Sequence, residues 1–180
     1  MDRAECDRIK RLDGDELVGL QLEKLNRLLA DILPHNHFYS EKLSETRKQL
    51  NSLDELSELP FTFKDELVDS GSHQDFAANL TFPVEDYVRF HRTSGTRGRP
   101  MVVLDTVNDW KWWVETWQYV LDAAEIEAGD TVLLAFSFGP FIGFWSAFDA
   151  LIHRKALVVP GGGLSTLARI DLSDAELDHL

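Results

Sequence analysis

The stretch Arg92-Thr93-Ser94-Gly95-Thr96-Arg97-Gly98-Arg99-Pro100 lies between two short runs of β-forming residues, 87–91 and 101–104. Its glycines permit backbone angles that other residues avoid, and they let a ligand approach the main chain closely. Its hydroxyl side chains and exposed N–H groups are hydrogen-bond donors. Four arginines and no carboxylate fall between positions 87 and 104, in a chain whose net charge is −13. This local positive patch predicts an anion-binding site.

The same stretch also fits an ordinary hairpin connection, because Gly, Ser and Thr between apolar runs are typical of turns. However, three hydroxyl residues, two glycines and two arginines among the seven residues Thr93–Arg99 are more than a turn requires. Two common nucleotide-binding motifs are excluded. The sequence has no Gly-Lys pair, which a Walker loop needs, and no G-x-G-x-x-G spacing.

Thr93–Pro100 resembles the phosphate-binding loop of adenylate-forming enzymes, the acyl-CoA synthetase superfamily. Three further segments resemble the phenylacetate–CoA ligases within it and follow the same order: Leu59–Leu67, Phe136–Gly143 and Val159–Gly163. The resemblance runs from about residue 25 to about residue 170. It implies an α/β fold in which a helical N-terminal region, 1–85, precedes an incomplete α/β nucleotide-binding lobe, 86–180.

The resemblance also implies a function. Such enzymes join a carboxylate to the α-phosphate of ATP, expel pyrophosphate and pass the acyl group to the thiol of coenzyme A. ATP, Mg²⁺ and coenzyme A are then the cofactors, and a carboxylic acid, aromatic or aliphatic, is the substrate. The residues expected to bind the ATP phosphates are Thr93, Ser94, Gly95, Thr96, Gly98 and Arg99. No catalytic residue is expected in this chain, because the family's catalytic lysine belongs to a C-terminal domain. No metal ligand is expected either, because His35 and His37 have no nearby Cys or acidic ligand set.

Two positions depart from the family pattern. Arg97 stands where the family usually has a second threonine, and Arg99 replaces the usual lysine. Arginine keeps the charge, but it is longer and forked, and the hydroxyl at position 97 is lost. Two functions therefore stay open: the N-terminal portion of a ligase that still binds nucleotide phosphates, and a non-catalytic remnant or interaction module that keeps the fold.

A strand–helix–strand pattern follows the loop region. Residues 131–136 and 156–160 are nearly continuous apolar runs, and the segment 143–152 between them has a helical pattern. This order predicts a βαβ unit of a parallel sheet, and ligands of such sheets bind beyond the carboxyl ends of the strands. Together with the resemblance, this favours an acyl-substrate wall made by Phe136, Phe141 and Ile142. The alternative is that these side chains fill the core.

Several helix signals lie outside the loop. Asp13 and Glu16 have the spacing of a capping box before an apolar seam that begins at Val18, and Ser52 and Glu55 repeat this spacing. A helix after Thr106 is expected to carry its large apolar residues on one side. These residues are Trp110, Trp113, Val114, Trp117, Val120, Leu121 and Ala124. We interpret the tryptophans as core residues rather than as a ligand cage.

Composition limits the classes of protein that remain. The 180 residues suffice for one domain with a core, and no apolar run reaches the length of a membrane span. The single cysteine, Cys6, cannot form an internal disulfide, which favours the cytoplasm. The acidic charge balance argues against nucleic acid as a partner. Because no lysine follows Lys155, we expect a ligase fragment that needs a C-terminal portion or a partner subunit.

Overall fold

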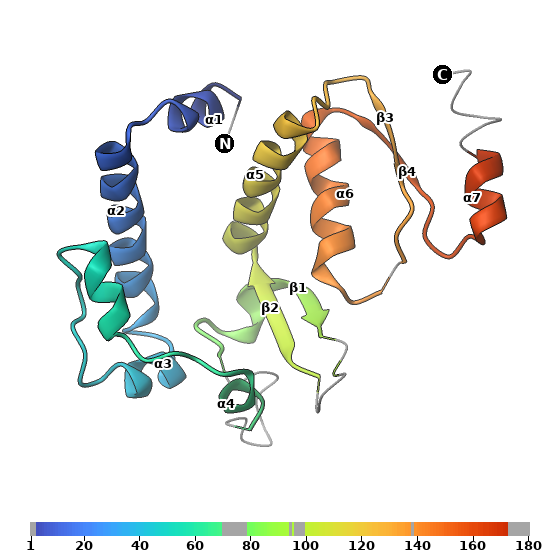
Figure 1. Ribbon diagram of the computed structural model, residues 1–180. Helices are drawn as coiled ribbons and strands as arrows, with labels where there is room; N and C mark the ends of the chain where they lie inside the picture. Colours follow the sequence, from blue (N-terminus) through green and yellow to red (C-terminus); the bar gives the residue numbers. More distant parts are fainter. Residues whose placement is uncertain (1–2, 70–78, 94, 96–99, 138, 173–180) are drawn as a thin grey trace. The chain divides into compact units, whose positions relative to one another are not determined.

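The computed structural model describes residues 3–69, 79–93, 95, 100–137 and 139–172 (Figure 1). The chain divides into two compact units, and each is described by itself. One unit is Asp7–Thr106, and the other combines Met1–Cys6 with Val107–Leu180. The described residues combine helices with short strands, so the predicted α/β class is confirmed. The division into regions 1–85 and 86–180 stays a prediction.

The N-terminal part of the chain is helical. Its elements are α1 (Arg3–Lys10), α2 (Gly14–Ile32), α3 (His37–Lys42), the 3₁₀ helix η1 (Leu53–Glu58), α4 (Lys64–Asp69) and the 3₁₀ helix η2 (Val84–Asp86). Helix α2 begins with the capping box that the sequence predicts. The Asp13 carboxylate accepts the Glu16 N–H at 2.9 Å, and the Glu16 carboxylate accepts the Asp13 N–H at 3.1 Å. These bonds satisfy two main-chain donors that a helix start otherwise leaves unpaired.

A small apolar core joins α2, α3 and the segment that follows α3 up to Leu59. Leu29 of α2 is buried with Leu43 and Leu50, and five partly buried residues pack around them: Leu22, Leu25, Leu33, Tyr39 and Leu59. Asn26 donates its amide N–H to the Leu50 carbonyl and accepts the Leu50 N–H, both at 2.8 Å. Val18, where the predicted seam begins, is exposed. The buried face of α2 therefore lies toward its C-terminal end.

The second predicted capping box, Ser52 with Glu55, is wrong. Ser52 precedes η1 in an extended conformation, but its side chain makes no capping hydrogen bond. The Glu55 carboxylate instead accepts the N–H of Asn51 at 2.8 Å and pairs with Arg47 at 3.0 Å. The pKa of Glu55 is lowered, chiefly by the main-chain bond from Asn51 and also by the charge of Arg47. Glu55 thus binds one residue earlier in the chain than a capping box requires.

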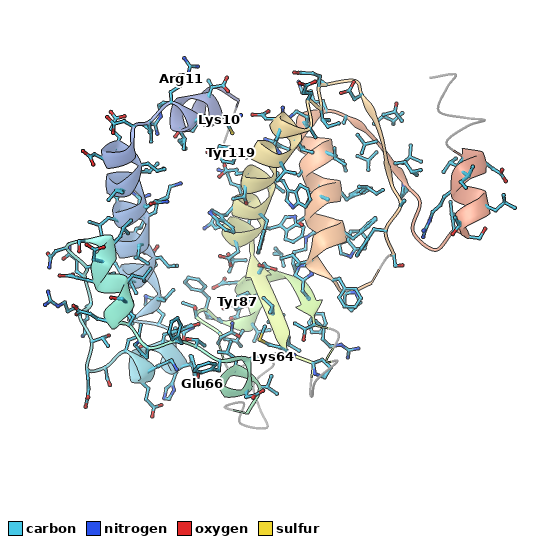
Figure 2. All side chains as sticks on the ribbon, viewed as in Figure 1. Lys10, Arg11, Lys64, Glu66, Tyr87 and Tyr119 are labelled. Atoms are coloured by element: carbon cyan, nitrogen blue, oxygen red, sulfur yellow. The ribbon has the colours of Figure 1, made fainter. Side chains whose placement is uncertain are left out.

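Polar anchors precede the first strand. Lys42 of α3 forms an ion pair with Glu66 of α4, and Figure 2 labels Glu66 and Tyr87. The Tyr87 hydroxyl oxygen accepts the N–H of Thr81 at 2.8 Å and the N–H of Phe82 at 3.1 Å. The chain segment before β1 is therefore tied to the first residue of that strand.

The two β-forming runs around the glycine-rich stretch are strands, as the sequence indicates, and they pair as an antiparallel hairpin. Strand β1 (Tyr87–Arg92) pairs with β2 (Val102–Thr106), and His91 stands opposite Val103. The register shifts between Tyr87 and Arg89, which marks a β-bulge or irregularity near the start of β1. The glycine-rich stretch therefore connects the end of β1 to the start of β2.

The other unit contains the predicted βαβ arrangement. Its elements are α5 (Val107–Ala123), β3 (Thr131–Leu134), α6 (Ile142–Arg154), β4 (Leu157–Pro160) and α7 (Thr166–Leu172). Strands β3 and β4 are parallel neighbours, with Thr131 opposite Leu157 and Leu134 opposite Pro160. Helices α5 and α6 lie side by side (Figure 1). Their core contains Leu121, Ala150, Leu151 and Ala156.

Two tryptophans of α5 pack toward α6, as the core interpretation expects. The Trp110 indole N–H donates to the Asp149 carboxylate at 2.7 Å, and the Trp117 N–H donates to the Ser146 hydroxyl at 2.9 Å. Both rings are thus fixed by a polar partner as well as by apolar packing. Val120 is exposed, so placing it on the buried side was wrong. The buried stripe of α5 is narrower than the apolar pattern indicates.

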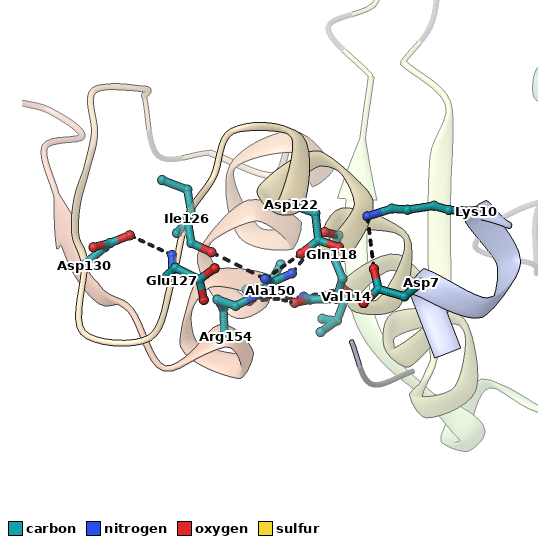
Figure 3. Close-up of polar contacts among 10 residues, drawn as sticks. All are labelled: Asp7, Lys10, Val114, Gln118, Asp122, Ile126, Glu127, Asp130, Ala150 and Arg154. Atoms are coloured by element: carbon teal, nitrogen blue, oxygen red, sulfur yellow. Dashed lines mark hydrogen bonds and ion pairs between the residues drawn. The ribbon is translucent and has the colours of Figure 1, made fainter. Parts of the chain in front are cut away.

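The C-terminal end of α6 is fastened by Arg154 (Figure 3). Its guanidinium pairs with the Asp122 carboxylate at 2.6 Å, and the two side chains are only 10% and 7% exposed. It also donates to the Gln118 side chain and carbonyl, both at 3.0 Å, and to the Ile126 carbonyl at 3.4 Å. These contacts join α6 to α5 and to the connection that follows α5. None of the described helices is long and apolar enough to cross a membrane.

Candidate functional site

The glycine-rich loop leaves the hairpin through a closed stem. The Thr93 N–H donates to the Met101 carbonyl at 3.0 Å. In the other direction, the Met101 N–H donates to the Thr93 hydroxyl oxygen at 2.9 Å. These two bonds continue the β1–β2 pairing by one position and define residues 94–100 as the loop.

The structure describes two of the six predicted phosphate-binding residues. Gly95 has a φ of 68°, in the left-handed region where glycine is favoured. Thr93 uses its main-chain N–H in the stem, which leaves its hydroxyl proton as the donor that can reach a ligand. The other four, Ser94, Thr96, Gly98 and Arg99, lie outside the described residues. Their part in phosphate binding stays a prediction.

A buried polar pair lies on the hairpin, two residues before the stem, and sequence reasoning missed it. The His91 imidazole Nε2 is 3.1 Å from an Asp105 carboxylate oxygen, and the two side chains are 6% and 7% exposed. The pKa of His91 is lowered mainly by burial, although the Asp105 charge raises it, and the charge of Arg89 lowers it further. The available signal was a histidine at the end of one β-forming run and an aspartate just after the other. Whether these two side chains become neighbours depends on the strand register.

The predicted acyl-wall residues belong to the unit that contains β3 and α6. Phe136 follows β3 and is exposed, as is Phe141, the residue before α6. Ile142 is half-buried at the first position of α6. Exposure of the two phenylalanines argues against the alternative that they fill the core. Their role in binding an acyl group stays a prediction.

Two contacts that the sequence did not reveal shape the segment around Gly139. The Trp145 indole N–H donates to the Gly139 carbonyl at 2.9 Å, which holds the segment against α6. A Cβ atom at position 139 would lie 3.1 Å from the Phe141 ring. Glycine at this position therefore lets the Phe141 ring lie close to the main chain.

The end of β4 is held next to the end of β3 by Gly161. Its N–H donates to the Leu134 carbonyl at 3.0 Å, and its carbonyl accepts from the Arg169 side chain at 2.9 Å. A Cβ atom at this position would lie 3.0 Å from a Leu133 methyl group and 3.2 Å from the Leu134 carbonyl oxygen. The carboxyl ends of the two parallel strands thus meet at a position that only glycine fills without displacement.

The described residues contain no group of three or more His, Cys, Asp or Glu side chains that could hold a metal ion. Mg²⁺ is an expectation of the family resemblance. The donors that suit it best are phosphate oxygens and water, together with one or two protein oxygens. A magnesium ion that arrives with a nucleotide is compatible with the described residues.

Comparison with known proteins shows which class of protein the chain is similar to. No protein-family model matches the chain. The chain is 31% identical over 174 residues to a phenylacetate–coenzyme A ligase of Pseudomonas putida, covering 95% of this chain and 39% of the relative. It is 35% identical over 167 residues to the Thermus thermophilus ligase of the same name, covering 91% of this chain and 37% of the relative.

Solved structures agree with these relatives. A 2-hydroxyisobutyryl-CoA ligase in complex with 2-HIB-AMP and CoA, in the thioesterification state, is 25% identical with a TM-score of 0.80. The match covers 89% of this chain and 35% of that one. An open conformation of the ligase, at 24% identity and a TM-score of 0.79, shows the same fold.

The fold and the relatives together show that the chain matches the N-terminal part of adenylate-forming ligases. Its curated relatives are the phenylacetate–coenzyme A ligases, among them that of Escherichia coli at 32% identity. The chain spans less than two fifths of the length of these relatives.

Proposed function

We propose that this chain is the nucleotide-phosphate-binding portion of an ATP-dependent carboxylate–CoA ligase. The observation that carries the proposal is the hairpin stem at Thr93 and Met101. It presents a glycine-, hydroxyl- and arginine-rich loop in a chain that is similar to CoA ligases over 95% of its length. The left-handed conformation of Gly95 supports a loop whose main chain approaches a ligand closely.

In the proposed reaction a carboxylate attacks the α-phosphate of ATP, so two anions must meet. Donors placed around the β- and γ-phosphates would stabilise the charge that leaves with pyrophosphate. We assign this task to the hydroxyl of Thr93, to the main-chain N–H groups of Ser94, Gly95, Thr96 and Gly98, to the hydroxyls of Ser94 and Thr96, and to the positive charge of Arg99. Mg²⁺, bound with the nucleotide, would supply further positive charge.

The second substrate is a carboxylic acid, and coenzyme A is the acceptor of the acyl group. Phe136, Phe141 and Ile142 are proposed to form the apolar wall for the acid. The exposure of both phenylalanines supports this role, because their rings are available to a ligand. The names of the relatives favour an aryl acid. Cys6, as the single cysteine, favours a cytoplasmic location. The complete reaction is proposed for the whole ligase and not for these 180 residues alone.

Calorimetry with ATP and Mg²⁺ tests the phosphate loop. We expect binding by the wild-type chain, and a Kd that is raised about 10-fold or more in Ser94→Ala and in Arg99→Ala, because each removes a hydrogen bond to a charged group. Arg27→Ala is the matched control. It removes one positive charge from an exposed ion pair on α2, so the Kd should not change. Absence of binding heat, or equal affinities in all four proteins, would support the non-catalytic remnant instead.

A further inference from the structure

The apolar pattern of the β1–β2 hairpin does not specify its register. Val88 and Phe90 are exposed on β1, and Val103 and Leu104 are only half-buried on β2. Strand register is strongly specified where one face is buried and apolar, because a slip by one residue turns every side chain to the other face. This hairpin lacks such a face, so another feature must select the observed pairing.

The irregularity in β1 makes register selection more demanding. The pairing shifts between Tyr87 and Arg89 and is then regular up to Arg92, opposite Val102. Extra residues in one strand are tolerated at a bulge, so the start of the hairpin does not fix its far end. The contact that selects the register must therefore lie between this irregularity and the loop.

His91 and Asp105 meet this requirement. In the observed register His91 stands opposite Val103 and Asp105 stands opposite Arg89, so the two residues are diagonal neighbours on one face. Both are buried, and their polar atoms are 3.1 Å apart. A slip of one strand by one residue would place them on opposite faces. A buried carboxylate would then lose the imidazole beside it, which strongly disfavours the alternative pairing.

We propose that His91 and Asp105 are a positioning pair that fixes the register of β1 against β2, so that the loop begins after Thr93 and ends before Met101. This inference rests on the proposed function, because it takes the loop to be the phosphate site. Neither side chain contacts the nucleotide in this scheme. The pair acts through the stem, where the number of loop residues and the direction of the Thr93 hydroxyl are set.

The test compares two double variants on the same two strands. His91→Val with Asp105→Val replaces the pair by β-forming apolar residues, which need not lower stability because no buried polar group is left behind. Phe90→Val with Leu104→Val is the matched control, since these two residues face each other on the other side of the hairpin. Three readouts are measured: hydrogen exchange at the Thr93 and Met101 amides, the Kd for ATP with Mg²⁺, and the thermal midpoint.

We expect the His91/Asp105 double variant to lose protection of both amides and to bind ATP about 10-fold or more weakly at a temperature well below its midpoint. The control should keep both properties. Asp105→Asn should also keep them, because an amide can maintain the polar contact with His91. A merely structural role would lower the midpoint without changing the Kd of the folded protein.

Retained protection and unchanged Kd in the His91/Asp105 double variant would overturn the proposal. If that variant gives no cooperative melt, Asp105→Thr replaces it, because the shorter side chain cannot reach His91; wild-type behaviour of Asp105→Thr would then count against the pair. If the wild-type chain itself binds no ATP, the proposed function fails. The amide exchange data still decide whether the pair fixes the register.

Discussion

At the scale of single residues, Arg154 joins α6 to α5 through several polar contacts. It neutralises the Asp122 carboxylate in a nearly buried site and also binds the Gln118 carbonyl. We expect Arg154→Ala to lower the free energy of unfolding by about 3–5 kcal/mol, because it removes the guanidinium that pairs with the buried Asp122 carboxylate. Urea denaturation measures this loss. The free energy of unfolding of Arg154→Lys should lie between those of the wild type and Arg154→Ala, since lysine keeps the charge but cannot form the forked contacts.

Arg27→Ala is the control for Arg154→Ala. Its ion pair with Glu23 has a comparable separation, 2.9 Å, but the side chains are 70% and 64% exposed. Exposed pairs contribute only about 0.2–1 kcal/mol. Equal losses of stability in the two alanine variants would show that burial of the Arg154 pair has no special weight.

The titration of His91 gives a second prediction at the residue scale. Burial lowers its pKa in the folded chain, with Asp105 opposing and Arg89 adding to this effect. The unfolded chain, with a histidine pKa of about 6.5, therefore binds the proton more readily than the folded chain. The stability contributed by neutral His91 is fully present at a pH above the unfolded-chain pKa of about 6.5. It is lost as the pH falls through the folded-state pKa.

Unfolding free energies measured between neutral and mildly acidic pH test this sign. The wild-type chain should lose stability on acidification, and His91→Gln should show a shallower slope because it cannot take up the proton. Titrating groups away from the pair contribute equally to both slopes, so the difference reports His91 together with its coupling to Asp105. A His91→Gln slope as steep as that of the wild type would contradict the lowered pKa.

At the scale of elements, the patterns that could be predicted were local. The capping box of α2, the hairpin around the loop and the βαβ unit each depend on residues close in sequence or on a continuous apolar run. The Ser52–Glu55 prediction failed because Arg47, outside the capping pattern, and Asn51 bind Glu55. The His91–Asp105 pair was missed because the two residues are neighbours only in one register of β1 against β2, and the local sequence pattern does not specify that register.

Gly161 offers a prediction for the strand ends. An added Cβ would lie 3.0 Å from Leu133 and 3.2 Å from the Leu134 carbonyl oxygen, so either the side chain or the sheet must move. We expect Gly161→Ala to cost about 1–3 kcal/mol, the usual range for overpacking. Gly19→Ala is the control. A Cβ at that position in α2 would meet nothing within 4 Å beyond the helix's own backbone, and alanine should stabilise the helix by up to about 1 kcal/mol. Thermal unfolding of the two variants should therefore shift in opposite directions.

At the scale of the whole molecule, the resemblance of sequence segments predicted the class of protein, whereas surface properties came only from the structure. Large apolar side chains are exposed in both units, including Phe61 at 84%, Phe63 at 65% and Leu167 at 68%. Exposed apolar surface of this kind favours association. The net charge of −13 opposes it, because like-charged chains repel one another.

These opposing effects predict a chain that associates in a concentration- and salt-dependent way. Salt screens the repulsion, with a Debye length that falls from about 30 Å at 0.01 M to about 10 Å at 0.1 M, while apolar contacts are not weakened. Sedimentation equilibrium should therefore give a weight-average mass that rises with protein concentration, and more steeply at the higher ionic strength. Phe61→Ser with Phe63→Ser should reduce the rise, because it removes two of the most exposed rings. A mass that stays at 20.5 kDa at high concentration in both salts would show that repulsion, together with the exposed polar surface, outweighs these apolar contacts.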